Sequence, residues 1–191
     1  MDYGKVYGAL HSKGKYFPGF SITPYVGTIQ ELVALHQPES LLDYGSGRGL
    51  QYLKRRVHEA WGGLLPHCYD IGVRGLDDKP GGTFGGTICT DVAEHIEEAD
   101  VPLFLTELAN YTADGGFLFL SISCRPTKKR LPDGRDVHVT IRPPSWWIDK
   151  LKALVARKAL DGDDLRVVAA FDVAGHFPGE ADHVWWSKTD G

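Results

Sequence analysis

The chain has 191 residues, 42% of them hydrophobic and 24% charged, a composition that is ordinary for a globular protein. A net charge of -4 gives the molecule no overall basic character that would draw it to nucleic acid. The longest apolar runs are too short to span a bilayer, the first residues lack the apolar core of a signal peptide, and three widely spaced cysteines suggest no disulfide framework. These features predict a single cytoplasmic domain over residues 1–191.

The apolar patterns predict strands that alternate with helices. Strands are expected at 40–44, 65–71, 85–91, 115–124, 165–173 and 182–188, and helices at 23–36, 49–61, 101–112 and 145–158. This order predicts an α/β, doubly wound, mostly parallel sheet with helices on both faces and a C-terminal antiparallel hairpin. Its parts are expected to be a cap segment with a helix (1–39), a ligand-binding core (40–124), an inserted hairpin (125–144), and the C-terminal helix and strands (145–191).

A glycine loop follows the first predicted strand. Gly45, Gly47 and Gly49 have G-x-G-x-G spacing, and Asp43 stands two residues ahead of them. Such a loop could hold a phosphate or a sugar, or be a bare tight turn. The spacing matches neither the dinucleotide fingerprint nor a P-loop, and the acidic residue would repel a pyrophosphate.

With two later segments, this loop resembles the first motif of class I S-adenosylmethionine-dependent methyltransferases. Asp70 stands where that family places an acid on the ribose hydroxyls, and "DVAEHI", residues 91–96, is similar to a segment common after its fourth strand. The resemblance implies S-adenosyl-L-methionine as the cofactor. The residues it places at the cofactor are Asp43, Gly45, Ser46, Gly47, Gly49, Asp70, Ile71, Asp91 and Val92.

The chain departs from the family after Asp70. Only thirteen residues separate Asp70 from Phe84, where the family fits a helix and a strand. The sheet is therefore expected to be abridged between the family's strands two and four, with this stretch crossing as a loop.

Two histidines are candidate catalytic bases. His95 follows Glu94 at the end of a predicted strand, and its alternative role is packing against the cofactor loop. Some methyltransferases with a related segment bind magnesium, and the matching positions are Asp91, Glu94 and His95, with His138 as a distant fourth. No metal is expected, because the segment also occurs in enzymes without one.

The predicted hairpin holds six of the 21 basic residues of the chain, within residues 125–142. Pro132-Asp133-Gly134 predicts its turn, and alternation places His138 and Arg142 on one face. That face would either line the acceptor pocket or be solvated. The residues expected at the substrate are Glu94, Arg142 and Trp146. The Gly- and aromatic-rich N-terminal segment would form a lid over the cofactor or an ordinary wrap.

The sequence thus predicts a methyltransferase for a small or medium acceptor, N- or O-methylated. The basic hairpin would either recruit a phosphate or carboxylate of an anionic acceptor or simply be solvated. A nucleic-acid methyltransferase and a non-catalytic cofactor-binding relative are the alternatives. No membrane partner is expected, and the oligomeric state is open.

Overall fold

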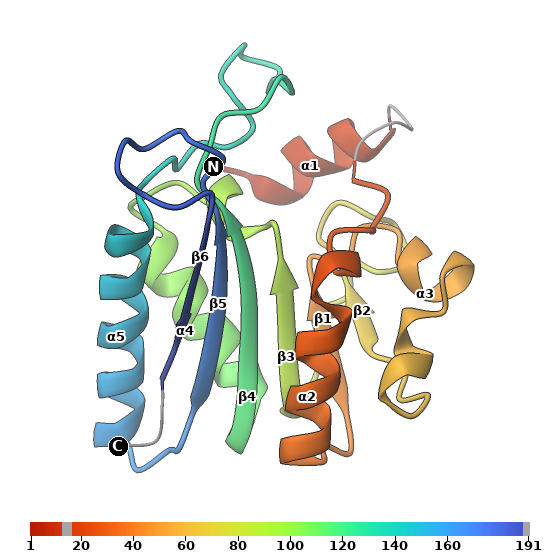
Figure 1. Ribbon diagram of the computed structural model, residues 1–191. Helices are drawn as coiled ribbons and strands as arrows, with labels where there is room; N and C mark the ends of the chain where they lie inside the picture. Colours follow the sequence, from red (N-terminus) through yellow and green to blue (C-terminus); the bar gives the residue numbers. More distant parts are fainter. Residues whose placement is uncertain (13–16, 189–191) are drawn as a thin grey trace.

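Six strands form one sheet in the order β2-β1-β3-β4-β5-β6. A computed structural model describes residues 1–12 and 17–188 (Figure 1). The strands are β1 (Leu41–Tyr44), β2 (His67–Tyr69), β3 (Phe84–Thr90), β4 (Thr112–Ser123), β5 (Arg166–Asp172) and β6 (His183–Ser187). The helices are α1 (Tyr3–Ser12), α2 (Val26–His36), α3 (Leu50–Lys54), α4 (Val101–Tyr111) and α5 (Pro144–Leu160), with short 3₁₀ helices η1 (Thr23–Tyr25), η2 (Val57–Trp61) and η3 (Ala93–His95).

The first five strands in the chain pair in parallel, and β6 alone of the six pairs antiparallel, against β5. This is the predicted doubly wound sheet with its C-terminal antiparallel hairpin. Because a parallel sheet is covered on both faces, its central strand β4 is an apolar run in which Phe117 to Ile122 are buried.

Helices cover both faces of the sheet (Figure 1). On one face, α4 and α5 pack against β3, β4 and β5 around the fully buried Trp147. On the other face, α2 and η2 pack on alternate residues of the same central strands, including Ile88 and Phe119. The alternation follows from the two-residue period of a strand, and it leaves the carboxyl ends of the strands free to carry a site.

The connection from β2 to β3 is a loop, as predicted. Residues 70–83 contain turns and bends but no helix or strand. The loop is closed locally, because the Asp70 backbone N–H donates to the carbonyl of Leu76 at 2.8 Å. No helix or strand therefore lies in the described residues between β2 and β3, as the short spacing between Asp70 and Phe84 predicted.

Two helices differ from the prediction. The N-terminal residues, expected as a lid or wrap of unstated structure, include α1, while residues 13–16 of that segment lie outside the described residues. The helix predicted over 49–61 is instead α3 followed by η2, because Arg56 adopts a positive φ of 49°. This break turns Val57 and Trp61 into the core against α2.

The inserted hairpin was predicted wrongly in part. Near its turn the two arms do pair: Arg130 and Asp136 form an antiparallel bridge, Leu131 donates its backbone N–H to Arg135 O at 2.9 Å, and Val137 donates to Lys129 O at 3.3 Å. Farther along, the second arm bonds elsewhere: Thr140 donates its backbone N–H to Glu94 O at 3.1 Å and its hydroxyl to Ile96 O at 2.6 Å. The segment is therefore bonded to itself near the turn, and beyond the turn its second arm is also bonded to the carboxyl end of β3.

Of the helices in the described part of the chain, none combines the length and the apolar character needed to cross a membrane.

Candidate active site

The glycine loop is fixed by hydrogen bonds and by close packing. Gly45 and Ser46 both donate their backbone N–H to the carbonyl of Tyr69, at 2.7 and 3.1 Å. Gly47 has a φ of 57°, and a Cβ there would lie 2.6 Å from the carbonyl oxygen of Phe17. The loop thus lies directly under the chain that follows α1, and only glycine fits at this position.

Asp43 lies beneath this loop. Its carboxylate is fully buried, and its Oδ2 accepts from Gln51 Nε2 at 2.7 Å and from the Tyr52 hydroxyl at 2.8 Å. Burial raises the pKa of Asp43 to about 7, against the lowering effect of these two hydrogen bonds. Asp43 lines neither of the two cavities described below, so its place in the structure is that of a support for α3 and the loop.

Replacing Asp43 with asparagine is expected to change how stability depends on pH. In the wild type the folded state keeps a proton that the unfolded chain releases above pH 3.8, so the free energy of unfolding falls as pH rises toward about 7. An Asn oxygen at the Oδ2 position keeps both hydrogen bonds and does not titrate. Melting temperatures measured from pH 5 to 8 should show Asp43→Asn gaining several degrees on the wild type toward pH 8. Parallel melting curves would contradict this.

Asp70 closes the other side of the loop. It is buried, and its two oxygens accept from the backbone N–H groups of Gly47 at 2.8 Å and Gly72 at 2.9 Å. His11 of α1 lies 3.4 Å away, measured from Nε2 to Oδ1. Because each carboxylate oxygen can accept more than one hydrogen bond, Asp70 retains capacity for ligand hydroxyls.

A cavity of about 380 Å³ lies between the glycine loop, the loop after Asp70 and α1. This volume is typical of small-molecule sites, which span roughly 300–1,000 Å³. Its walls are apolar and aromatic for the most part, with the carboxylates of Asp70 and Asp91 among the polar groups. Residues that line it include Tyr3, Tyr7, His11, Tyr44, Gly45, Ile71, Val92, Leu103 and Phe104. We call it the cofactor cavity.

A second cavity, of about 330 Å³, adjoins the first. It is more polar, and we call it the acceptor cavity. The side chains that give it this character include Ser21, Glu94, Ser123, Arg125, Lys129, His138 and Asp172. The two cavities have four lining residues in common: Phe17, Gly45, Asp91 and His95. A donor in one cavity and an acceptor in the other would therefore meet at these four residues.

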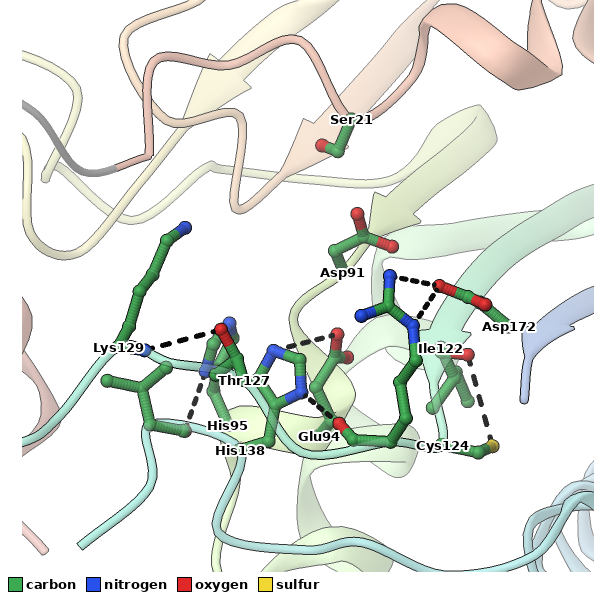
Figure 2. Close-up of polar contacts among 12 residues, drawn as sticks. Ser21, Asp91, Glu94, His95, Ile122, Cys124, Thr127, Lys129, His138 and Asp172 are labelled. Atoms are coloured by element: carbon green, nitrogen blue, oxygen red, sulfur yellow. Dashed lines mark hydrogen bonds and ion pairs between the residues drawn. The ribbon is translucent and has the colours of Figure 1, made fainter. Parts of the chain in front are cut away.

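Glu94, His95 and His138 lie together in the acceptor cavity (Figure 2). Burial raises the pKa of Glu94 well above its ordinary value, with the charge of Asp91 adding to the effect. Burial also lowers the pKa of His95 to about 3, with the charge of His138 adding to the effect, and burial lowers that of His138. Both imidazoles are therefore neutral near pH 7 and can accept a proton or a ligand, although His95 is a weak base.

The structure does not bring every predicted residue to the cavities. Ser46 and Gly49 shape the loop without lining either cavity. Arg142 is exposed and paired with Glu98 at 2.6 Å, and its guanidinium lies 5.9 Å from the ring centre of Trp146, so both side chains lie outside the cavities. Arg142 and Trp146 were expected at the substrate because strand alternation and helical phase were extended beyond the part of the hairpin in which the two arms pair.

The N-terminal segment was expected as a lid or a wrap, but no site residue was predicted in α1 or in residues 17–21, which line the cavities. Tyr7 donates its hydroxyl to His95 O at 3.3 Å, and Arg48 donates to the backbone carbonyl of His11 at 2.7 Å. One signal was present: Tyr3, Tyr7, Leu10 and His11 have the spacing of one helical face. Gly4 and Gly8 in the same stretch suggested a loop.

The comparison with family models decides the class of protein. A model described as "Methyltransferase domain" matches residues 22–169, more than half of the chain. The chain belongs to this methyltransferase family. Neither the curated proteins nor the solved structures gave a match.

Membership agrees with the fold and makes the protein a class I, S-adenosylmethionine-dependent methyltransferase. S-adenosyl-L-methionine is the methyl donor that the family implies. The cavity of this methyltransferase fits such a donor: Asp70 offers acceptor oxygens for ribose hydroxyls, and Ile71, Val92 and Phe104 offer apolar surface for a base. Gly45 and Asp91 stand where this cavity joins the other.

Proposed function

We propose that this methyltransferase transfers a methyl group to a nitrogen or oxygen of a small or medium, anionic acceptor. The observation that carries the proposal is the sharing of Gly45, Asp91, His95 and Phe17 by an apolar cavity and a polar one. Methyl transfer from a sulfonium is an in-line displacement, and holding both reactants in line can supply about 7–11 kcal/mol of the barrier reduction. Two adjoining cavities are the arrangement that this positioning requires.

The donor supplies an electrophilic methyl group; the chain positions and shields it. Asp91 presents a carboxylate at the junction, where it would attract the positive sulfonium, and its Oδ1 is fixed by the Ser121 hydroxyl at 2.7 Å. Helix α1 excludes water, since Tyr7 packs on His95 at 5.5 Å between ring centres. His138 lines the acceptor cavity, and when no other ligand occupies its Nε2 it would accept a proton from an acceptor that arrives protonated.

The cations that line the acceptor cavity support an anionic acceptor. Lys129 lines the acceptor cavity, and its Nζ lies 4.5 Å from the ring centre of Phe17, which lines both cavities. Arg125 lines the same cavity and is paired with Asp172 at 2.8 Å. A phosphate or carboxylate would bind most directly to the Lys129 ammonium, which is a compact point charge.

Nucleic acid is the less favoured acceptor. All four arginines of the segment 125–142 form ion pairs within the chain: Arg125 with Asp172, Arg130 with Asp136, Arg135 with Glu97, and Arg142 with Glu98. Their charge is largely offset, which weakens the basic footprint that phosphate binding needs.

Isothermal titration calorimetry with S-adenosylmethionine and S-adenosylhomocysteine tests the cofactor, and a radiolabelled methyl donor with anionic metabolites tests the acceptor. Binding of neither cofactor at high micromolar concentration would refute the proposal. Methylation of an oligonucleotide that weakens steeply with salt would replace the small acceptor by nucleic acid.

Replacing Lys129 with glutamine is expected to raise KM for an anionic acceptor roughly tenfold, because one charge-assisted contact worth about 1.5 kcal/mol is lost. The dissociation constant for S-adenosylhomocysteine should change little. Lys128→Gln is the matched control, since Lys128 is exposed and does not line the cavity. Equal acceptor KM values in the two variants would remove Lys129 from the acceptor site.

A further inference from the structure

We propose that Glu94, His95 and His138 bind one divalent transition-metal ion in the acceptor cavity. This reverses the expectation from the sequence that no metal binds. The use of the ion to orient an acceptor rests on the proposed function, but binding of the ion does not.

The three side chains converge from two distant parts of the chain. Glu94 and His95 come from η3 at the end of β3, and His138 comes from the second arm of the inserted segment (Figure 2). Their ligand atoms all lie within 4.8 Å of one another, and His138 Nε2 lies 3.9 Å from Glu94 Oε1. A metal about 2.1 Å from each ligand separates ligand atoms by roughly 3–4 Å, so a shift of under 1 Å closes the site.

Both imidazoles are oriented by backbone carbonyls. His95 Nδ1 lies 2.8 Å from Val137 O, and His138 Nδ1 lies 2.7 Å from Arg125 O. A carbonyl oxygen can only accept, so each Nδ1 carries the hydrogen, and each neutral ring keeps a lone pair on Nε2. A carbonyl on the far nitrogen is the arrangement that fixes metal-binding histidines in proteins.

The buried carboxylate of Glu94 is an independent observation that points to a ligand among these three side chains. The Glu94 side chain is 0% exposed, and within the described residues no other side chain donates a hydrogen bond to the carboxylate, which receives only weak contacts from the backbone N–H groups of Glu94 and Ser123. A buried carboxylate with no stronger partner is costly. Its neighbours His95 and His138 present lone pairs rather than hydrogens, so either a proton or a metal ion must lie among these atoms.

The surrounding charges leave room for a cation. Asp91, Glu94 and Asp172 line the cavity, and so do Arg125 and Lys129. Asp172 is paired with Arg125 at 2.8 Å, and the Lys129 ammonium stands over Phe17. The charges of Arg125 and Lys129 also act on Asp91 and on His138, but among the described residues neither cation forms an ion pair with Asp91 or Glu94.

The donor set selects the class of metal. Two imidazoles and one carboxylate suit Zn²⁺, Co²⁺, Fe²⁺ or Mn²⁺, whereas Mg²⁺ and Ca²⁺ prefer oxygen ligands throughout. Three protein ligands leave a coordination position open, as in catalytic rather than structural metal sites. In this cavity the open position would take an oxygen or nitrogen of the acceptor beside the residues shared with the cofactor cavity.

The test is metal titration of the tag-free, chelator-treated protein without cofactor. Calorimetry should show about one equivalent of Zn²⁺ with a dissociation constant below about 10 μM, and Co²⁺ should give visible absorption bands. His138→Gln should weaken binding at least roughly tenfold. His183→Gln, which removes an exposed histidine of β6 outside the cavities, should bind as the wild type does.

A second readout does not depend on a variant. On addition of Zn²⁺, the Nε2 resonances of two of the eight histidines should shift in long-range ¹H–¹⁵N spectra. The Nδ1 atoms of the same two histidines should stay protonated. Absence of stoichiometric binding, or equal affinity in both variants, would overturn the proposal and indicate a protonated Glu94. Titration of the chelator-treated protein with S-adenosylhomocysteine separates the two ideas: cofactor binding without metal binding rejects only the metal site, and the converse rejects only the proposed function.

Discussion

Replacing Gly47 with alanine is expected to weaken S-adenosylhomocysteine binding at least roughly 100-fold and to cost about 2–3 kcal/mol of stability. Gly47 has a left-handed φ of 57°, which alone disfavours a side chain. In addition, the new Cβ would lie 2.6 Å from Phe17 O and 2.9 Å from Gly19 N. These are backbone atoms, so the loop and the chain above it must separate. That separation opens the junction of the two cavities.

Gly162→Ala is the control for this prediction. Gly162 also has a positive φ, 88°, but a Cβ there would meet no atom within 4 Å. It should lose about 1 kcal/mol and keep full cofactor affinity. Calorimetry and thermal unfolding of both variants measure the two effects. If Gly47→Ala binds cofactor as tightly as Gly162→Ala does, then the loop does not hold the cofactor.

Replacing Asp70 with asparagine is expected to weaken cofactor binding roughly 10- to 100-fold. Asparagine keeps one acceptor oxygen, but its amide group would face the backbone N–H of either Gly47 or Gly72, and that buried donor costs about 1–3 kcal/mol when unpaired. The charged acceptor for ribose hydroxyls is lost as well. Affinity for S-adenosylhomocysteine and the melting temperature should fall together.

Asp77→Asn is the matched control, because Asp77 is a carboxylate of the same loop. It accepts from the backbone N–H of Gly75 at 2.8 Å, is exposed, and lines neither cavity. Its replacement should leave affinity unchanged. A similar affinity in Asp70→Asn and Asp77→Asn would show that Asp70 does not contact the cofactor.

The sheet could be predicted because its strands follow simple local rules. The apolar run of β4 and the glycine loop after β1 each signal their structure within a few residues. The abridged connection could be predicted from chain length alone. Helix α1 could not, because Gly4 and Gly8 argue against a helix. The structure shows what Gly4 permits: α1 packs closely on the loop after Asp70, and a Cβ added at Gly4 would lie 3.4 Å from the Ile71 side chain.

Site residues that belong to one sequence motif could be predicted from the sequence. Residues that distant segments bring together could not. The motifs were expected to bring Gly45, Asp70 and Asp91 together, and all three line one cavity; that they bind the cofactor there stays a prediction. Whether His138 or Arg142 reached the acceptor cavity depended on how the inserted segment pairs, and its bonds to Glu94 and Ile96 are long-range. The meeting of His138 with Glu94 therefore follows from tertiary contacts that periodicity does not encode.

Helix α1 spans the cofactor cavity and is fastened at both ends. Near the start of α1, the Tyr3 hydroxyl donates a hydrogen bond to the Asp100 carboxylate at 2.8 Å and accepts one from the Glu97 backbone N–H at 3.0 Å. At the end of α1, His11 Nε2 lies 3.4 Å from Asp70 Oδ1. Because α1 is attached at both ends, it cannot open by rotating about one end while the attachment at the other end stays intact. Exchange of substrate and product cofactor then requires one attachment to break, so the free energy of that local opening would set the residence time of the spent cofactor and limit turnover.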